Sequence, residues 1–363
     1  MTENSENRAT SNSPITIHEM SSNEQAYSKF QEEVSFKYGF VGLKLDKLSL
    51  TARIDEELHN QILTDEFNLY DVYGIKEPNL TPNGELASYK GQFFYNEKEN
   101  WYVEYTPISS IKMNKRPLKI EFTPSKVSKE HFLTVFNLLL PHLSDIACST
   151  FHLAYDFERD LSTLKVNWPK AMYRPIYKGI KLETMDFGAP KGNYHITNYN
   201  KLKERADQGD SAEIEIYQQY ENLWRIEYKF YNEGNIKKEL KNGLPFLAKI
   251  PVFIENLEGL EFQNLGVNEK IALFAMKNKP ELFAGSDDRT IRKYKKLAES
   301  IAEVNLNVFF QNALDYTEVF NQEPARVNFF DFIKKLLAGQ IPQIEKELST
   351  RTLDGQSDNS IIE

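Results

Sequence analysis

The chain has 363 residues, of which 40% are hydrophobic and 27% charged, so it is long enough for one large domain or two smaller ones. No run of about 18 apolar residues occurs and the first 25 residues are polar, so neither membrane insertion nor export is indicated and we expect a cytoplasmic protein. The single Cys148 excludes an intrachain disulfide and a cysteine-based zinc site, and we expect it to be buried.

The first half of the chain alternates between helix and strand patterns. Residues 1–27 are rich in Ser, Asn, Glu and Thr and are predicted to be disordered. Apolar spacing then predicts a strand at 48–54, a helix at 56–67, a hairpin of 92–95 with 101–105, a strand at 117–122 and a helix at 129–146.

The second half separates into a strand-rich and a helix-rich part. Strands are predicted at 150–157, 172–177, 179–187, 193–199 and 223–231. Helices are predicted within 237–249 and at 268–276, 288–302, 306–319 and 329–348. We therefore expect an α+β region with an antiparallel sheet at 28–235, a helical region at 236–348 and a second disordered tail at 349–363. The absence of a Walker-type loop and of a G-x-G-x-x-G motif argues against nucleotide-driven chemistry.

Basic residues are concentrated in two places, although the net charge of the chain is −9. Residues 165–205 hold nine basic and three acidic side chains. A second cluster lies in the predicted helix at 288–302 and consists of Arg289, Arg292, Lys293, Lys295 and Lys296. Two basic patches on an acidic chain fit a DNA-binding protein whose remaining surface is neutral or repulsive, although the second cluster could also be a solvated helix face.

Tyr199 ends a strand-like run that leads into a basic segment. A tyrosine can act as a covalent nucleophile, but its ordinary pKa near ~10 means that it needs a metal, a base or nearby positive charge. In extended structure residues i and i+2 share a face, so we expect Lys201 to lie beside Tyr199 and to hold a phosphate oxygen against it. Lys203 and Arg205 continue the basic segment and are candidate DNA contacts.

Several sequence blocks occur in an order that is specific as a set, although each block alone is weak. They are Ile120-Glu-Phe-Thr-Pro-Ser-Lys126, His152-Leu-Ala-Tyr-Asp-Phe-Glu158, Glu183-Thr-Met-Asp-Phe-Gly188, Asn198-Tyr-Asn-Lys-Leu-Lys-Glu-Arg205 and Leu223-Trp-Arg-Ile-Glu227. In this order and spacing the chain resembles the Rep_trans family, the rolling-circle replication initiators of staphylococcal-type plasmids. The resemblance spans about residues 45–235, with a looser similarity to about residue 320, and implies an HUH-nuclease-like antiparallel palm.

A metal site is expected beside the tyrosine, because a cation polarises a phosphodiester that is being cleaved. Strand alternation places His152, Ala154 and Asp156 on one face, and Glu227 emerges on the same side as Arg225. We predict Asp156 and Glu227 as ligands of Mg²⁺ or Mn²⁺, which favour oxygen donors. His152 stands where the family usually has Asp, and four residues of strand span about 13 Å, so His152 is either a ligand, an orienting neighbour or a structural histidine. Glu158 is an alternative ligand.

The resemblance implies a nicking-closing enzyme. Tyr199 would attack a phosphodiester at a plasmid double-strand origin, leaving a free 3′-OH and a 5′-phosphotyrosyl link that a later 3′-OH can reverse. Lys201 and the metal would stabilise phosphate charge, and Arg225 would orient Glu227 or touch the DNA backbone. The resemblance further implies origin recognition through Arg289 to Lys296, a homodimer and a host UvrD-like helicase as partner.

Two other functions remain open. A conjugative relaxase of an integrative element would share the chemistry but differ in DNA specificity. A non-catalytic origin-binding regulator derived from an initiator is suggested by His152 and by Thr197, which replaces an Arg often found two residues before the family's tyrosine. The intact blocks around Tyr199 and Glu227 argue against this second alternative.

Overall fold

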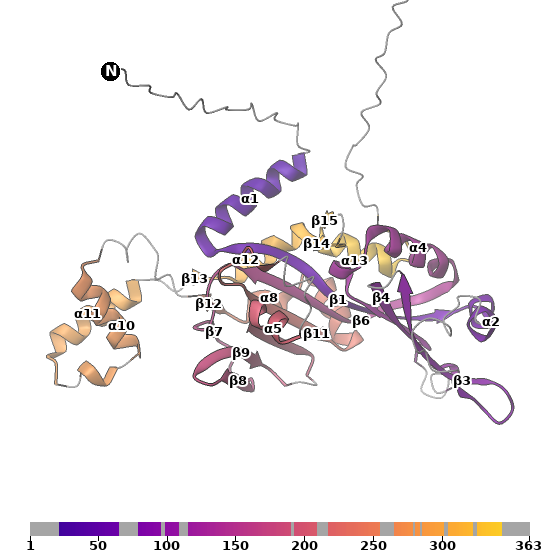
Figure 1. Cartoon of the computed structure of the whole chain (residues 1–363), viewed down its shortest axis with the longest axis horizontal. Helices are drawn as coiled ribbons and strands as arrows, with labels where there is room; N and C mark the ends of the chain where they lie inside the picture. Colours follow the sequence, from indigo (N-terminus) through magenta and orange to yellow (C-terminus); the bar gives the residue numbers. More distant parts are fainter. Residues whose placement is uncertain are drawn as a thin grey trace, which may run out of the picture.

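A large sheet, ordered β2-β3-β4-β5-β1-β6-β11-β10-β9-β8, runs through the molecule (Figure 1). The computed structural model describes residues 22–64, 79–95, 99–108, 115–189, 192–208, 217–254, 265–278, 280–283, 285–300, 304–321 and 325–342. The strands on this path are β1 (Phe40–Ile54), β2 (Asn79–Leu80), β3 (Leu86–Tyr95), β4 (Glu99–Tyr105), β5 (Leu118–Phe122), β6 (Leu143–Phe157), β8 (Tyr173–Lys178), β9 (Lys181–Phe187), β10 (Tyr194–Asn200) and β11 (Trp224–Tyr231). Neighbouring strands on it pair antiparallel, which confirms the predicted α+β class.

Shorter strands complete the β-structure. β14 (Thr317–Val319) pairs in parallel with β1 and antiparallel with β15 (Ala325–Val327), so a segment from beyond residue 300 joins the main sheet. A separate three-stranded sheet consists of β7 (Lys165–Val166), β12 (Val252–Ile254) and β13 (Val304–Asn305).

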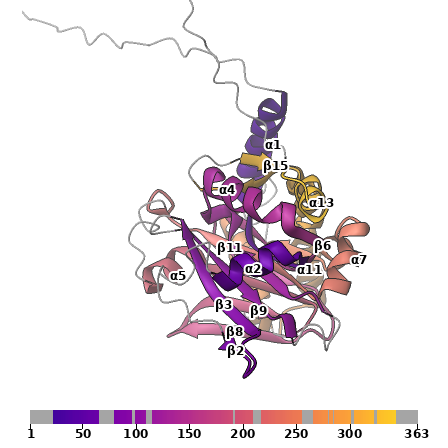
Figure 2. The same ribbon diagram turned by 90° about the vertical axis from the view of Figure 1, so that its right-hand side faces the viewer.

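Most of the described helices lie against or beside this sheet (Figures 1 and 2). The described helices are α1 (Ser22–Tyr38), α2 (Glu56–Thr64), η1 (Pro124–Lys126), α4 (Lys129–Leu139), η2 (Leu140–His142), α5 (Lys201–Gln208), α7 (Glu233–Lys241), α8 (Pro245–Lys249), α10 (Val267–Asn278), η3 (Pro280–Phe283), α11 (Asp288–Ser300), α12 (Asn307–Asn312), η4 (Ala313–Tyr316) and α13 (Phe329–Leu337). In Figure 1, α10 and α11 are set apart from the sheet and lie together at one end of the molecule, to the left of it. Among the described helices, none has the length and apolar character needed to cross a membrane.

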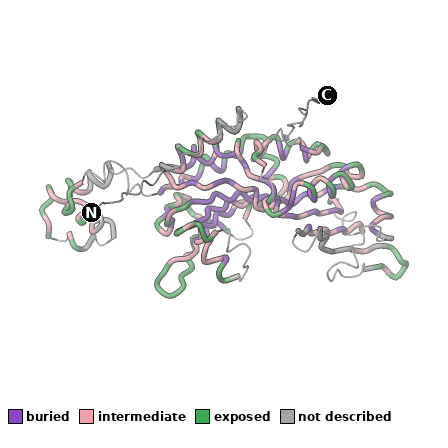
Figure 3. The backbone as a smooth tube through the Cα atoms, turned by 45° about the horizontal axis from the view of Figure 1, so that its top comes forward, coloured by how far each residue is buried: buried purple, intermediate pink, exposed green. Residues whose placement is uncertain are grey.

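One face of the sheet packs against α12 and α13 and forms an aromatic core with them. Tyr155 of β6 packs on Phe310 of α12 with ring centroids 4.6 Å apart, and Phe151 packs on Phe329 of α13 at 5.2 Å. Each such fully buried aromatic stabilises the fold by about 1.5–3 kcal/mol through removal of apolar surface from water. Figure 3 shows the centre of the sheet as buried and the outer sides of the helices as exposed. Cys148 is buried as expected, and burial raises the pKa of its thiol to about 12.

Three predicted helices are shorter than the sequence pattern suggested. The helix at 129–146 ends at Leu139, because Pro141 cannot continue an α-helix, and the chain enters β6 at Leu143. The predicted helix at 306–319 ends with η4, after which β14 pairs with β1. The predicted helix at 329–348 ends at Leu337, where Gly339 adopts a φ of 70° that suits a helix C-terminus.

The ends of the chain were predicted to be disordered. Helix α1 begins at Ser22, so residues 22–27 are helical and that part of the prediction was wrong. Residues 1–21 and the predicted tail at 349–363 lie outside the described residues. The predicted boundary at residue 235 stays a prediction.

Candidate active site

Polar side chains occupy the sheet face opposite the aromatic core. Cross-strand pairing places opposite residues on the same side, and this polar face consists of Lys44 of β1, His152, Ala154 and Asp156 of β6, Arg225, Glu227 and Lys229 of β11, His195, Thr197 and Tyr199 of β10, and Thr184 and Asp186 of β9. Asp46 of β1 also lies on this face, where it contacts Arg225. The intervening residues of β6 and β11, such as Tyr155 and Tyr228, are fully buried in the core. The predicted alternation of these two strands is therefore confirmed.

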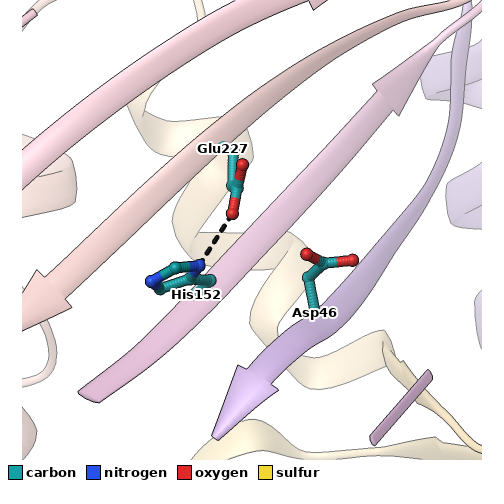
Figure 4. Close-up of side chains that lie close together, drawn as sticks. All are labelled: Asp46, His152 and Glu227. Carbon is teal, nitrogen blue, oxygen red and sulfur yellow. Dashed lines mark hydrogen bonds and ion pairs between the residues drawn. The ribbon is translucent and has the colours of Figure 1, made fainter. Parts of the chain in front are cut away.

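Three side chains from adjacent strands form a candidate metal-binding cluster at the centre of the polar face. Asp46, His152 and Glu227 each offer a ligand atom, and these atoms lie within 4.8 Å of one another. Figure 4 shows the three side chains approaching one another over β6, with His152 directed at Glu227. The Nδ1 atom of His152 lies 2.8 Å from Oε1 of Glu227. Burial by itself raises the pKa of Glu227, but the hydrogen bond to His152 and the charge of Lys229 outweigh it and hold this pKa well below its usual range.

Asp46 was missed by the sequence reasoning, and a β-bulge explains its position. In the β1–β6 pair, Leu45 lies opposite Leu153 and Lys47 opposite His152, so Asp46 is an extra residue on β1. A bulge turns the extra side chain out of the regular alternation and is common beside functional sites. The signal is visible in the sequence, because the buried Leu45 and Leu48 are three residues apart rather than two.

Asp156 was predicted as a metal ligand but lies in a different interaction. Arg225 is directly opposite Asp156 and donates two hydrogen bonds to its carboxylate, from Nε at 2.6 Å and Nη2 at 2.8 Å. Burial raises the pKa of Asp156, but the charge and hydrogen bonds of Arg225 outweigh it and lower this pKa overall. A third hydrogen bond of 3.0 Å joins Nη1 of Arg225 to Asp46. Arg225 thus hydrogen-bonds Asp46 as well as Asp156, and its predicted role toward Glu227 or the DNA backbone stays a prediction. Glu158, the alternative ligand, is exposed at the end of β6.

Tyr199 lies next to both groups on the polar face. It is directly opposite Arg225, and Glu227 is its diagonal neighbour on β11, a relation that brings side chains within reach of each other. Burial raises the pKa of Tyr199 well above its ordinary value of 10; Arg225 acts against this rise, whereas the negative charges of Glu227 and Asp46 add to it. A cation near these carboxylates would favour the phenolate.

Lys201 is near Tyr199, but for a different reason from the one predicted. The strand ends at Asn200, whose side-chain oxygen accepts a hydrogen bond from the backbone N–H of Lys203 and so caps helix α5. Lys201 is therefore the first residue of a helix, and its Nζ lies 5.5 Å from the centroid of the Tyr199 ring. Burial and the charge of Arg225 lower the pKa of Lys201 to about 8, although Glu204 accepts a 2.9 Å hydrogen bond from it.

The remaining predicted DNA contacts occupy two places. Lys203 is partly exposed and forms a 2.9 Å ion pair with Glu183, whereas Arg205 is buried with its Nε 3.3 Å from Glu204. The second basic cluster lies on α11, where Arg289, Arg292 and Lys293 are exposed. Lys295 and Lys296 also belong to α11, but their side chains lie outside the described residues.

His195 and Thr197 form a second polar group around Asp186. Thr197 donates a hydrogen bond of 3.1 Å to Asp186, and Nε2 of His195 lies 3.6 Å from the same carboxylate oxygen. Burial lowers the pKa of His195, so its neutral form is favoured. The threonine that replaces the family's arginine thus supports Asp186 from β10.

The Asp46–His152–Glu227 cluster has a donor set that fits a divalent ion. Two carboxylates and an imidazole suit Mn²⁺ or Mg²⁺, with the nitrogen favouring Mn²⁺. The ring nitrogen of His152 that faces the carboxylates is Nδ1, so this atom would bind the ion (Figure 4). Lys229, whose Nζ lies 3.2 Å from Glu227, balances part of the negative charge.

Comparisons with known proteins agree with the sequence blocks. No family model matches the chain. A replication initiation protein of Staphylococcus aureus is 28% identical over 224 residues, which cover 61% of this chain and 67% of the relative. Another from the same organism is 32% identical over 132 residues, covering 36% and 40%. A solved rolling-circle replication initiator protein from Geobacillus stearothermophilus covers 65% of this chain and 85% of its own, with 11% identity and a TM-score of 0.28. The predicted resemblance to the staphylococcal-type initiators is thereby confirmed, and the chain is a relative of the replication initiation proteins of Staphylococcus aureus.

Proposed function

We propose that this protein initiates rolling-circle replication of a plasmid by nicking and later rejoining one strand of its double-strand origin. The observation that carries the proposal is the position of Tyr199 on the same sheet face as the Asp46–His152–Glu227 cluster, with Lys201 beside its ring. Cleavage of a phosphodiester by a phenol requires a nucleophile, a nearby positive charge and ligands for a metal ion. Tyr199, Lys201 and the cluster would supply these three parts. The staphylococcal relatives, named replication initiation proteins, supply the biological context.

In the proposed reaction the phenol oxygen of Tyr199 attacks the phosphorus and loses its proton. The bond from phosphorus to the 3′ oxygen breaks, and that oxygen leaves as a 3′-OH after taking up a proton. The protonated Lys201 binds a non-bridging oxygen, and Arg225 holds Asp46 and Asp156 in place. Asp46, His152 and Glu227 would hold a divalent ion, which when bound polarises the phosphate.

Each step conserves the energy of one phosphodiester. A phosphotyrosyl bond replaces the broken bond, so a later 3′-OH can reverse the reaction without a nucleotide cofactor. The resemblance adds three proposals: the exposed cations of α11 recognise the origin, the active form is a homodimer, and a host UvrD-like helicase unwinds the nicked DNA. A conjugative relaxase would use the same site on another DNA sequence.

Incubation with supercoiled plasmids that carry candidate origins, in Mg²⁺ or Mn²⁺, tests the proposal. We expect the wild type to relax its cognate plasmid and to leave protein on the cut strand, and Tyr199→Phe to bind this DNA without cutting it. Tyr194→Phe, which changes a tyrosine on the core side of the same strand, is the matched control and should remain active. Relaxation by Tyr199→Phe at the wild-type rate would identify another nucleophile. Specific binding without cutting by the wild type would identify a non-catalytic regulator.

A further inference from the structure

The β8–β9 hairpin carries several exposed apolar side chains, of which Tyr173 also packs on the core residue Phe187 with ring centroids 5.1 Å apart. Among the described residues, five of the eleven exposed large apolar side chains lie between residues 172 and 180. Ile180 is 96% exposed and Tyr177 58% exposed. Hairpin turns favour Gly, Asn and Asp, so an isoleucine at the most exposed position of this turn is not explained by turn geometry. These side chains are available for a ligand.

The tip of the hairpin carries cations. The two strands hold Arg174, Lys178 and Lys181 against Glu183 and Asp186, and Arg174 is paired with Asp186. At the tip, Lys178 and Lys181 lie directly opposite each other, a like-charge pair that disfavours the hairpin unless anions lie nearby. Asp207 of α5 provides one, at 2.9 Å from Lys178. A polyanion along the tip would neutralise the remaining charge.

The position of the hairpin relates it to the candidate nucleophile. Ile176 of β8 pairs with Thr184 of β9, and Thr184 pairs with Tyr199 of β10, so all three lie on one line across the sheet. Strand alternation places Lys178 on the same face as Ile176 and Tyr177 on the opposite face, so both faces of the hairpin tip present side chains to a ligand. Two strand spacings separate Ile176 from Tyr199, or about 10 Å. The ion pair of Lys178 with Asp207 further joins the tip to the helix that follows Tyr199. Figure 1 shows this hairpin at the lower edge of the sheet, below α5.

We propose that the tip of the β8–β9 hairpin binds single-stranded DNA that leads to the nick site, with one unpaired base stacked on Tyr177, another packed against Ile180, and Lys178 and Lys181 on the backbone. Aromatic and apolar faces interleaved with cations are characteristic of single-strand binding, because every base offers a π face once it is unpaired. Duplex DNA hides these faces, so the exposed apolar side chains would gain little from it. This inference rests on the proposed function and adds an element at the edge of the sheet that guides the strand toward Tyr199.

The test measures binding of a fluorescent oligothymidylate by anisotropy in the Tyr199→Phe protein, so that no cutting occurs. Tyr177→Ala combined with Ile180→Ala should weaken binding by roughly 10- to 100-fold, since stacking contributes about 1–3 kcal/mol per base, and should leave the salt dependence unchanged. Lys178→Ala with Lys181→Ala should instead reduce the salt slope by about 0.7 for each phosphate that the variant no longer binds. Val308→Ala, at an exposed apolar residue of α12, is the control and should bind as the parent does.

Thermal unfolding of the variants at the same temperature as the parent protein shows that they are folded. Two outcomes would then overturn the inference. Unchanged oligothymidylate affinity in the Tyr177 and Ile180 variant would exclude stacking. A shift from dimer to monomer in sedimentation, with unchanged DNA affinity per protomer, would mean that a second copy covers the hairpin. Because this assay needs no cleavage, its result is independent of whether Tyr199 is the nucleophile.

Discussion

Asp46 supplies one of the two carboxylates of the proposed metal site, and Glu227 supplies the other. We predict that Asp46→Asn, which preserves the shape and the hydrogen bond from Arg225, weakens Mn²⁺ binding by more than about tenfold in calorimetry. Asp55→Asn is the matched control. Asp55 is an exposed residue of a second group, with Glu57 and His142, that lies outside the proposed site. Equal Mn²⁺ affinity in wild type and Asp46→Asn would contradict the assignment.

Lys201 gives a pH prediction. Its pKa is lowered to about 8, so the side chain is mostly charged below pH 8 and mostly neutral above it. If the charged form binds phosphate, kcat/KM for nicking falls as pH rises through about 8, because this ratio reports the free enzyme. Lys201→Arg, which stays charged, should move the fall to higher pH. If kcat/KM of the wild type and of Lys201→Arg falls at the same alkaline pH, and both proteins unfold at the same temperature, another group is responsible for the fall.

The Arg225–Asp156 pair gives a stability prediction, since both side chains are at least 98% buried. Asp156→Leu should lower the free energy of unfolding by about 3–5 kcal/mol, because the guanidinium stays buried without its main partner. Adding Arg225→Met should cost much less than the sum of the two single changes. Urea unfolding of the four proteins measures this coupling, and strictly additive effects would contradict the pairing.

At the scale of elements, the sequence block Glu183 to Gly188 ends on a glycine because a larger residue would not fit there. Gly188 follows β9 with a φ of 95°, and a Cβ there would lie 2.8 Å from the Trp168 ring and 2.8 Å from the backbone oxygen of Tyr194. We predict that Gly188→Ala destabilises the protein by about 1–3 kcal/mol more than Gly84→Ala. Gly84 also has a positive φ, but nothing lies within 4 Å of its Cβ position. Equal unfolding midpoints for the two variants would contradict this account.

The sequence predicted the faces of the strands but not their register. Alternation in β6 and β11 identified His152, Asp156, Arg225 and Glu227 as one polar set, because a strand repeats every two residues. Which of them meet depends on cross-strand pairing, which places Arg225 opposite Asp156 and Ala154 opposite Glu227. Asp46 could not be assigned to the site from its own strand, because its neighbour in the cluster, His152, lies more than 100 residues away on β6. The predicted helices at 129–146 and 329–348 were too long, because the apolar spacing continues past Pro141 and Gly339, where the helices have ended.

At the scale of the whole molecule, charge is distributed so that an acidic protein can approach DNA. The net charge is −9, yet the tip of the β8–β9 hairpin carries Lys178 and Lys181, and α11, on a different part of the chain, exposes Arg289, Arg292 and Lys293. We expect local attraction at these two places to outweigh the overall repulsion, since screening limits the reach of charges to about 8–10 Å at physiological salt. The hairpin would hold the strand to be cut, and α11 would contribute to the choice of origin.

The central claim is that Tyr199 becomes covalently joined to DNA. Its most direct test is mass spectrometry of the protein after reaction with a cognate origin, followed by complete nuclease and protease digestion. The account predicts a nucleotide on the peptide that contains Tyr199, linked through a 5′ phosphate, and no such adduct in Tyr199→Phe. An adduct on a different residue, or efficient nicking with no adduct, would contradict it.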